Sequence, residues 1–111
     1  MLLSDLMNDV SLKLISGTLP ESFEGVYVGD LLSRAMSHVE SGNLWITIMN
    51  NINVVAVASL TEASAVVLAE DVVLMPEAEV AAKEKGICIL SSSDSAFELC
   101  CRIGALCAAR E

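Results

Sequence analysis

Basic and aromatic residues are scarce in this chain. Six Lys and Arg residues stand against fifteen Asp and Glu residues, which gives a net charge of −9. Such an acidic chain is repelled by phosphate backbones and anionic lipid surfaces, so neither nucleic acid nor a membrane is an expected partner. Aromatic residues make up 4% of the chain while hydrophobic residues reach 54%, so the core must be aliphatic. This apolar excess predicts a sheet covered on both faces and a homodimer interface.

The chain also lacks the common catalytic and cofactor-binding motifs. No G-x-x-x-x-G-K-[ST], G-x-G-x-x-G or G-x-S-x-G pattern occurs, which argues against phosphate-loop, standard dinucleotide and hydrolase sites. The single histidine, His38, has no spaced partner with which to form a zinc site. We therefore expect no catalytic residue, no metal and no cofactor. Cys88, Cys100, Cys101 and Cys107 are interpreted as buried free thiols, with a metal or redox role as the alternative.

Neither a signal peptide nor a membrane span is expected. The first nine residues carry acids where a signal peptide needs a basic region and an apolar run. The longest apolar tract, residues 52–69, contains Asn53, Thr61 and Glu62 and changes its period midway, which predicts a helix followed by a strand. We expect a soluble, cytoplasmic protein whose residues 1–111 form a single α/β domain.

Short strands alternate with short helices along the sequence, which predicts a mainly parallel sheet with helices on both faces. The loop at 18–24 is too short for a helical crossover, so the first strand should run antiparallel to the second or lie apart from it. The expected architecture is a three-layer α-β-α sandwich around roughly five strands. The expected strands are residues 12–16, 25–28, 44–48, 65–68 and 87–90, and the expected helices are 2–10, the segment between Asp30 and Gly42, 53–62, 76–86 and 95–108.

Local signals mark the ends of several of these helices. Asp30 follows a strand at a turn and is a natural N-cap, and Gly42 is expected at the C′ position of the same helix. Pro76 at the first helical position and Gly86 after the last one bound another helix. Residues 95–98 read as a capping box. The apolar stripe expected on the helix after Asp30 consists of Leu31, Leu32, Ala35, Met36 and Val39.

Three amides occupy the turn where the 44–48 strand passes into the next helix. These are Asn50, Asn51 and Asn53. Ligands of open α/β sheets usually sit at the carboxyl ends of the strands, so this turn is the main candidate for a small polar binding site. The alternative is that the amides only cap the helix and hold the turn.

Two further polar turns follow expected strands. Ser91, Ser92 and Asp94 come before the last helix, where free N–H groups can hold an anion; the alternative is that they are helix caps. Glu70 and Asp71 would oppose phosphate and favour a cation or a cationic ligand, or they form a solvated loop. The expected pocket joins the three amides to Ser91, Ser92 and Asp94 on its opposite side.

Several landmarks in the chain support a family resemblance. They are the strand-turn-helix 25–32, the strand 44–48 after Gly42, the strand 65–68, the helix 76–86, and the strand 87–90 with Phe97 after its serine turn. With them, the chain from Gly25 onward resembles the DRTGG family. That domain is found before the kinase module of some phosphotransferases and within certain phosphotransacetylases and CBS-containing pyrophosphatases.

The chain departs from this family at its signature residues. Met49-Asn50-Asn51 stands where the family has Gly-Asp-Arg, and Ala69-Glu70-Asp71 stands where it has Thr-Gly-Gly. The chain therefore looks more like stand-alone variants of the family, which carry amides in the first turn. Any anion-binding role of the family's Arg and glycines does not carry over to these positions.

The resemblance implies a non-catalytic regulatory and dimerising module. We expect a homodimer that binds a small metabolite or nucleotide at the carboxyl ends of the strands and acts through the dimer or through a partner enzyme or kinase. The first alternative is a protein-interaction adaptor without a small ligand. The second is a small enzyme that uses one of the turn acids Asp30, Glu70 or Asp94.

Overall fold

A computed structural model of the chain describes residues 1–109. After an amino-terminal helix and strand, strands and helices alternate along the chain, as the sequence predicts. The helices are α1 (Leu3–Asp9), α2 (Leu32–His38), α3 (Ile52–Thr61), α4 (Pro76–Lys85) and α5 (Ala96–Ala109). The strands are β1 (Lys13–Ser16), β2 (Val26–Val28), β3 (Leu44–Thr47), β4 (Ala65–Leu68) and β5 (Ile89–Ser91).

The five strands form one sheet in the order β1-β5-β4-β3-β2. Strands β2, β3, β4 and β5 are parallel, and β1 pairs antiparallel with β5. The first strand thus lies apart from the second, at the opposite edge of the sheet, which was one of the two expected arrangements. Because β1 is antiparallel, its first residue, Lys13, pairs with Ser91 at the carboxyl end of β5.

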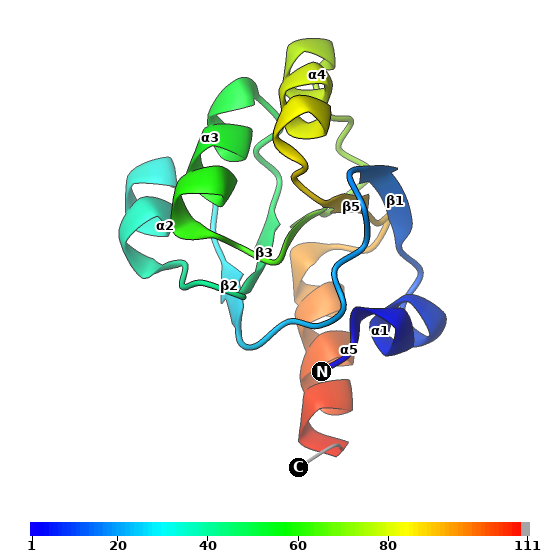
Figure 1. Cartoon of the computed structure of the whole chain (residues 1–111). Helices are drawn as coiled ribbons and strands as arrows, with labels where there is room; N and C mark the ends of the chain where they lie inside the picture. Colours follow the sequence, from blue (N-terminus) through cyan, green and yellow to red (C-terminus); the bar gives the residue numbers. More distant parts are fainter. Residues whose placement is uncertain (110–111) are drawn as a thin grey trace.

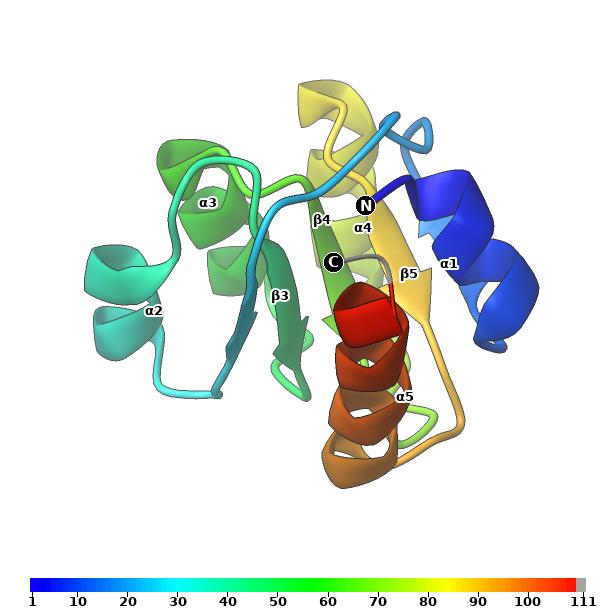
Figure 2. The same cartoon turned by 90° about the horizontal axis from the view of Figure 1, so that it is seen from below.

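The helices cover both faces of the sheet, so the predicted three-layer α-β-α sandwich is confirmed. Helices α2, α3 and α4 lie on one face, while α1 and α5 lie on the other (Figures 1 and 2). Every residue of β3 and of β4 is buried, as expected for central parallel strands. Alternate residues of these strands face two hydrophobic cores, with Leu44 and Ile46 on the α1–α5 side and Trp45 on the α2–α4 side.

Most helix boundaries follow their local sequence signals. Pro76 opens α4, and Gly86 ends it in the left-handed conformation with φ +68°. The capping box before α5 is confirmed, because the Glu98 amide donates to Ser95 Oγ at 3.1 Å and the Ser95 amide donates to Glu98 Oε1 at 3.2 Å. No helix among residues 1–109 is long and apolar enough to cross a membrane.

Helix α2 differs from its prediction. Leu31, not Asp30, occupies the N-cap position, and the helix ends at His38, well before Gly42. The expected apolar stripe is also only partly correct: Ala35 and Val39 are buried, but Leu31 is 64% and Met36 49% exposed. Since α2 is short and lies at the β2 edge of the sheet, too little of the molecule surrounds it to bury a full stripe (Figure 2).

Candidate binding site at the carboxyl ends of the strands

The three amides of the β3–α3 turn have different roles. Asn51 is the N-cap of α3, and its Oδ1 accepts a hydrogen bond of 3.0 Å from the Asn53 amide. Asn50 contacts the neighbouring β4–α4 loop, where its Nδ2 donates to the Val73 carbonyl at 2.7 Å and its carbonyl accepts from the Met75 amide at 3.0 Å. The side chain of Asn53 lies in the exposed first turn of α3. Two of the three amides therefore hold local structure.

The β4–α4 loop begins with two residues in the left-handed conformation. Glu70 has φ 61° and Asp71 has φ 57°, a region that costs non-glycine residues energy. The turn is held from the next loop, because the Glu70 amide donates to the Asp94 carbonyl at 2.8 Å and the Asp71 amide donates to the Ser92 carbonyl at 2.9 Å. Both side chains remain exposed at the carboxyl end of β4.

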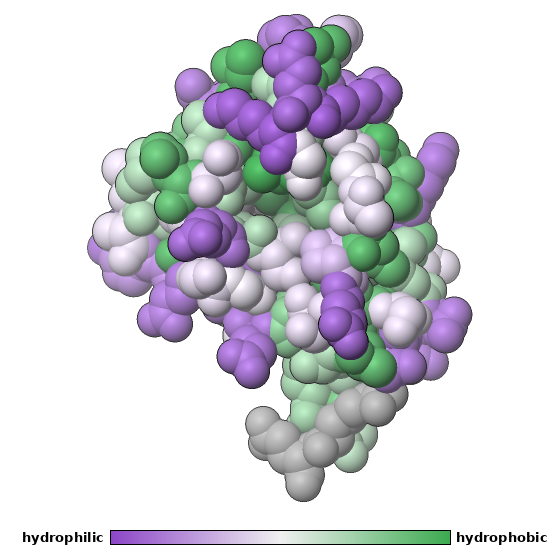
Figure 3. Space-filling model, viewed as in Figure 1, coloured by the Kyte–Doolittle hydropathy of each residue, from purple (hydrophilic) through white to green (hydrophobic). Residues whose placement is uncertain are grey.

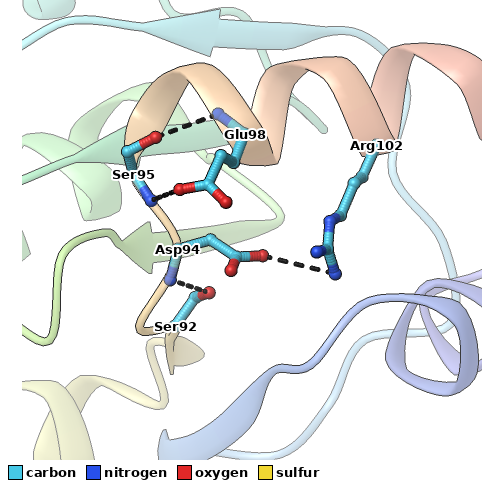
Figure 4. Close-up of polar contacts among 5 residues, drawn as sticks. All are labelled: Ser92, Asp94, Ser95, Glu98 and Arg102. Atoms are coloured by element: carbon cyan, nitrogen blue, oxygen red, sulfur yellow. Dashed lines mark hydrogen bonds and ion pairs between the residues drawn. The ribbon is translucent and has the colours of Figure 1, made fainter.

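The β5–α5 loop is ordered by its own polar side chains (Figure 4). Ser92 is buried, and its Oγ accepts a hydrogen bond of 3.0 Å from the Asp94 amide. The Asp94 carboxylate forms an ion pair of 3.5 Å with Arg102 of α5 through Oδ2, an atom that is closed to solvent and makes no hydrogen bond. At 3.5 Å this pair is longer than a good charge-assisted hydrogen bond.

Asp30 holds the β2–α2 loop, which also lies at this edge of the sheet. Its Oδ1 accepts hydrogen bonds from the Thr47 hydroxyl at 2.8 Å and from the Ile48 amide at 2.9 Å. The Thr47 hydroxyl in turn accepts from the Met49 amide at 3.1 Å. Asp30 thus joins the β2–α2 turn to the end of β3, which replaces the helix-capping role predicted for it.

Hydrogen bonds therefore connect all four loops that follow the parallel strands. Asp30 links the first loop to the second, Asn50 links the second to the third, and Glu70 and Asp71 link the third to the fourth. The amide turn and the serine turn were expected to face each other across one pocket, but they are not neighbours in the structure. Because β4 lies between β3 and β5 in the sheet, the β4–α4 loop separates the two turns.

A hollow of about 320 Å³ opens at this edge, between the start of β1 and the β4–α4 loop. Its charged and polar lining comes from four elements of the chain: Lys13 of β1, Asp71 of the loop, Glu79 of α4 and Ser91 of β5. The rest of its wall consists of Ile15 and residues 72–74. Of the predicted site residues, the structure brings Asp71 and Ser91 together here. The sequence did not predict Lys13 or Glu79 as site residues. For Lys13 the reason is that no local motif indicates that β1 lies beside β5.

The cysteine and histidine residues form no additional site at this edge. Within residues 1–109, no three His, Cys, Asp or Glu side chains are grouped so that they could hold a metal ion. Cys88 is buried, and burial raises the pKa of its thiol to about 11. Burial, followed by the neighbouring Cys101, also raises the pKa of Cys100. The expectation that all four thiols are buried is confirmed only for Cys88: Cys100 and Cys107 are half-buried, and Cys101 is exposed.

The fold and the polar edge define an α/β domain with a ligand-sized hollow at the carboxyl ends of its strands. No family model and no curated protein matches the chain. A solved structure with the same fold contains the CBS and DRTGG domains of the regulatory region of Clostridium perfringens pyrophosphatase, complexed with its activator, diadenosine tetraphosphate. The TM-score is 0.71 at 14% sequence identity, over 92% of this chain and 45% of that chain.

This similarity supports a DRTGG-related fold and agrees with the resemblance seen in the sequence. The chain spans less than half of the regulatory region that it matches. The matched protein is a regulatory region that binds a nucleotide activator, not a catalytic domain. At 14% identity, the similarity concerns the fold alone.

Proposed function

We propose that this protein is a non-catalytic regulatory module that senses a small polar metabolite. The observation that carries this proposal is the hollow of about 320 Å³ at the carboxyl ends of the strands, with Asp71 and Ser91 in its wall. Open α/β sheets usually bind their ligands at this edge. We further propose that the protein acts as a homodimer, and that ligand binding is transmitted through the dimer or to a partner enzyme.

The hydrogen bonds between the loops give a ligand a physical means of influencing the protein. Asp71 lines the hollow, and its amide is held by the Ser92 carbonyl of the β5–α5 loop. A ligand that pulls on Asp71 therefore acts on two loops at once. Helix α5 begins directly after the β5–α5 loop, so a shift of this loop on ligand binding would change the position of α5. The similarity to a ligand-controlled regulatory region supports this kind of role.

The charges around the hollow favour a ligand with a positive group. Asp71 and Glu79 supply two carboxylates and Lys13 supplies one ammonium group, in a chain whose net charge is −9. Of these, Glu79 already forms an ion pair of 3.2 Å with Lys83. An amine or a zwitterion can pair with Asp71 while its carboxylate reaches Lys13. A polyphosphate would be repelled by the net charge of −9 of the whole chain.

Native mass spectrometry of the purified protein with a metabolite pool tests the proposal. The pool should contain amines, amino acids and nucleotides, so that each charge class competes. We expect a reproducible added mass from an amine or a zwitterion. Asp71→Asn should abolish the uptake while the fold is kept, because asparagine tolerates the left-handed conformation that this position needs. Glu77→Gln, on the same helix as Glu79 but outside the hollow, is the matched control.

Two outcomes would refute the sensor. One is a protein that takes up nothing from the pool, and the other is uptake that Asp71→Asn leaves unchanged. The second outcome would move the ligand away from this hollow. A nucleotide that binds and is lost with Asp71→Asn would keep the site but overturn the proposed ligand charge.

The alternative function is an interaction adaptor without a small ligand. The observation that favours it is that Asn50 and Asn51 already have partners within the chain, as amides with a structural role would. An adaptor predicts that Asn51→Ala lowers only stability, by about 0.5–2 kcal/mol for a lost cap. It also predicts that a partner protein is captured equally well with and without the metabolite pool. A sensor predicts instead that a metabolite bound in the hollow changes this capture, and that Asp71→Asn removes the change.

A further inference from the structure

A second, larger hollow lies on the opposite face of the sheet from α2, α3 and α4. It is a groove of about 650 Å³ between β2 and α5. Val26 and Val28 of β2 form part of its lining, and they are 39% and 44% exposed. Ile103, Gly104 and the thiols of Cys100 and Cys107 line it from α5, and Glu24 is the one charged side chain among the lining residues.

The groove exists because this face of the sheet has too few helices. Three helices cover the other face, but only α1 and α5 lie here, and α5 packs over the centre of the sheet through Leu99 and Ile103 (Figure 2). The apolar side chains of β2 on this face therefore have no helix above them. Val26 and Val28 therefore remain partly exposed on an edge strand, although their side chains are of a type normally buried in the core.

The second half of α5 is also only partly covered, with Leu106 and Cys107 half-buried against the core. Residues 103–109 read Ile-Gly-Ala-Leu-Cys-Ala-Ala and contain no charged side chain, yet only Ile103 among them is buried. A helix that is apolar all round is normally enclosed by protein. In the surface view, hydrophilic residues gather over α4 at the top, whereas the coloured part of α5 that is visible near the lower end is pale green (Figure 3).

Gly104 gives a more specific indication. It lies inside α5, where glycine costs roughly 0.5–1 kcal/mol relative to alanine. A Cβ atom added at Gly104 would meet nothing within 4 Å, so the chain itself does not need a glycine here. A glycine facing an apolar groove allows another backbone to approach closely.

We propose that a second copy of this chain fills the groove, with α5 of each copy lying over β2 of the other. The two α5 helices would run antiparallel and cross at their Gly104 residues. Each α5 would then be enclosed between its own sheet and that of the partner, and the apolar halves of both helices would be buried. This interface rests on the homodimer proposed above but not on the proposed ligand.

Charge and area both fit a second copy. Two chains of net charge −9 repel one another, so they can associate only through a face with few charges. The groove and residues 103–109 form such a face. Helix α5 is about 21 Å long at 1.5 Å per residue and roughly 10 Å wide with its side chains. An interface built from two such helices and the strands beside them is at the small end of specific interfaces, near the threshold of about 1,000 Å², so we expect a weak dimer.

Analytical ultracentrifugation of the wild type and three variants tests the interface. Gly104→Glu should give a folded monomer, because the single chain has open space at this position while the dimer has none. Val26→Glu tests the strand side of the groove in the same way and covers the case in which the helix variant fails to fold. We expect each to raise the dimer dissociation constant at least about tenfold, the effect of overpacking a fitted contact. Val80→Glu, at a 57% exposed apolar residue of α4, should leave the dimer unchanged.

Thiol labelling gives an independent readout. Cys101 is exposed and does not line the groove, whereas Cys107 does. Cys107 should react with a maleimide more slowly in concentrated protein, where the dimer forms, than in dilute protein. Cys101 should react at the same rate at both concentrations. Gly104→Glu should remove the concentration dependence at Cys107. Circular dichroism of each variant verifies that α5 is still helical.

The outcomes separate the interface from the other proposals. A wild type that is monomeric at micromolar concentration overturns the dimer and the interface but leaves the metabolite hollow standing. A dimer that survives both Gly104→Glu and Val26→Glu overturns this interface alone. A protein that stays monomeric yet binds neutral lipid vesicles through α5 would show that a membrane surface, not a second copy, covers the groove.

Discussion

The Oδ1 atom of Asp30 lies 2.8 Å from the hydroxyl oxygen of Thr47, a residue that is only 2% exposed. This contact joins the exposed turn after β2 to the buried end of β3. The same hydroxyl accepts the Met49 amide, so one oxygen links two neighbouring loops. Thr47 thereby fixes the start of the loop that carries Asn50 and Asn51.

Thr47→Val should therefore lower stability without disturbing the packing of β3. Valine has nearly the same shape, but it leaves the Met49 amide without its acceptor and the Asp30 carboxylate with one donor fewer. We expect a loss of about 1–3 kcal/mol in the free energy of unfolding, measured by urea denaturation. Thr18→Val, in an exposed loop, is the matched control and should change stability by less than about 0.5 kcal/mol. Equal effects of the two substitutions would contradict the role given to the hydroxyl.

Asn50→Ala should loosen the β4–α4 loop more than any other substitution in the amide turn. It removes the 2.7 Å hydrogen bond to the Val73 carbonyl, worth about 0.5–1.5 kcal/mol. Hydrogen exchange at the Met75 amide, which donates to the Asn50 carbonyl, should become faster. Asn53→Ala should not destabilise the protein, since alanine is the better helix former at this exposed position. Unchanged exchange at Met75 in the Asn50 variant would refute the link between the two loops.

The elements that the sequence predicted well are those with local signals. The expected strand 65–68 has the same bounds as β4, Pro76 and Gly86 bound α4, and the Ser95–Glu98 box opens α5. Each of these depends on residues only a few positions apart. The α-β-α layering followed from the alternation of short strands and helices, which is a property of the whole pattern.

The parts that could not be predicted depend on contacts between distant segments. Asp30 was expected to cap α2, but it reaches Thr47, 17 residues further along the chain. Lys13 lines the polar hollow only because β1 pairs with β5 at the far edge of the sheet. No periodicity in residues 12–16 indicates that edge. The role of the asparagine turn was left between a cap and a ligand site, and the contacts of Asn50 and Asn51 show the structural part of that role.

The buried thiol of Cys88 should make stability fall in mildly alkaline solution. Burial raises its pKa from 9.0 to about 11, so between these values the unfolded chain loses the thiol proton while the folded chain keeps it. The contribution is complete below pH 9 and is lost as the pH rises toward about 11, by at most roughly 3 kcal/mol. Urea denaturation at pH 8 and at pH 10 measures the loss. In Cys88→Ala the difference between the two pH values should shrink, and an identical pH dependence would show that other groups cause it.

Gly17→Ala should be among the most harmful glycine substitutions in the chain. Gly17 has φ +77°, and an added Cβ would lie 2.5 Å from the Ile87 carbonyl oxygen, which belongs to the backbone and cannot turn away. Gly86→Ala is the matched control, since φ is +68° but nothing lies within 4 Å of the added atom. The control should lose only the cost of the left-handed conformation, about 1–2 kcal/mol. Gly17→Ala should lose clearly more and should disturb the pairing of β1 with β5, and with it the Lys13 side of the hollow. Thermal unfolding of the two variants compares them directly, and equal losses would mean that the two strands separate at Gly17 without cost.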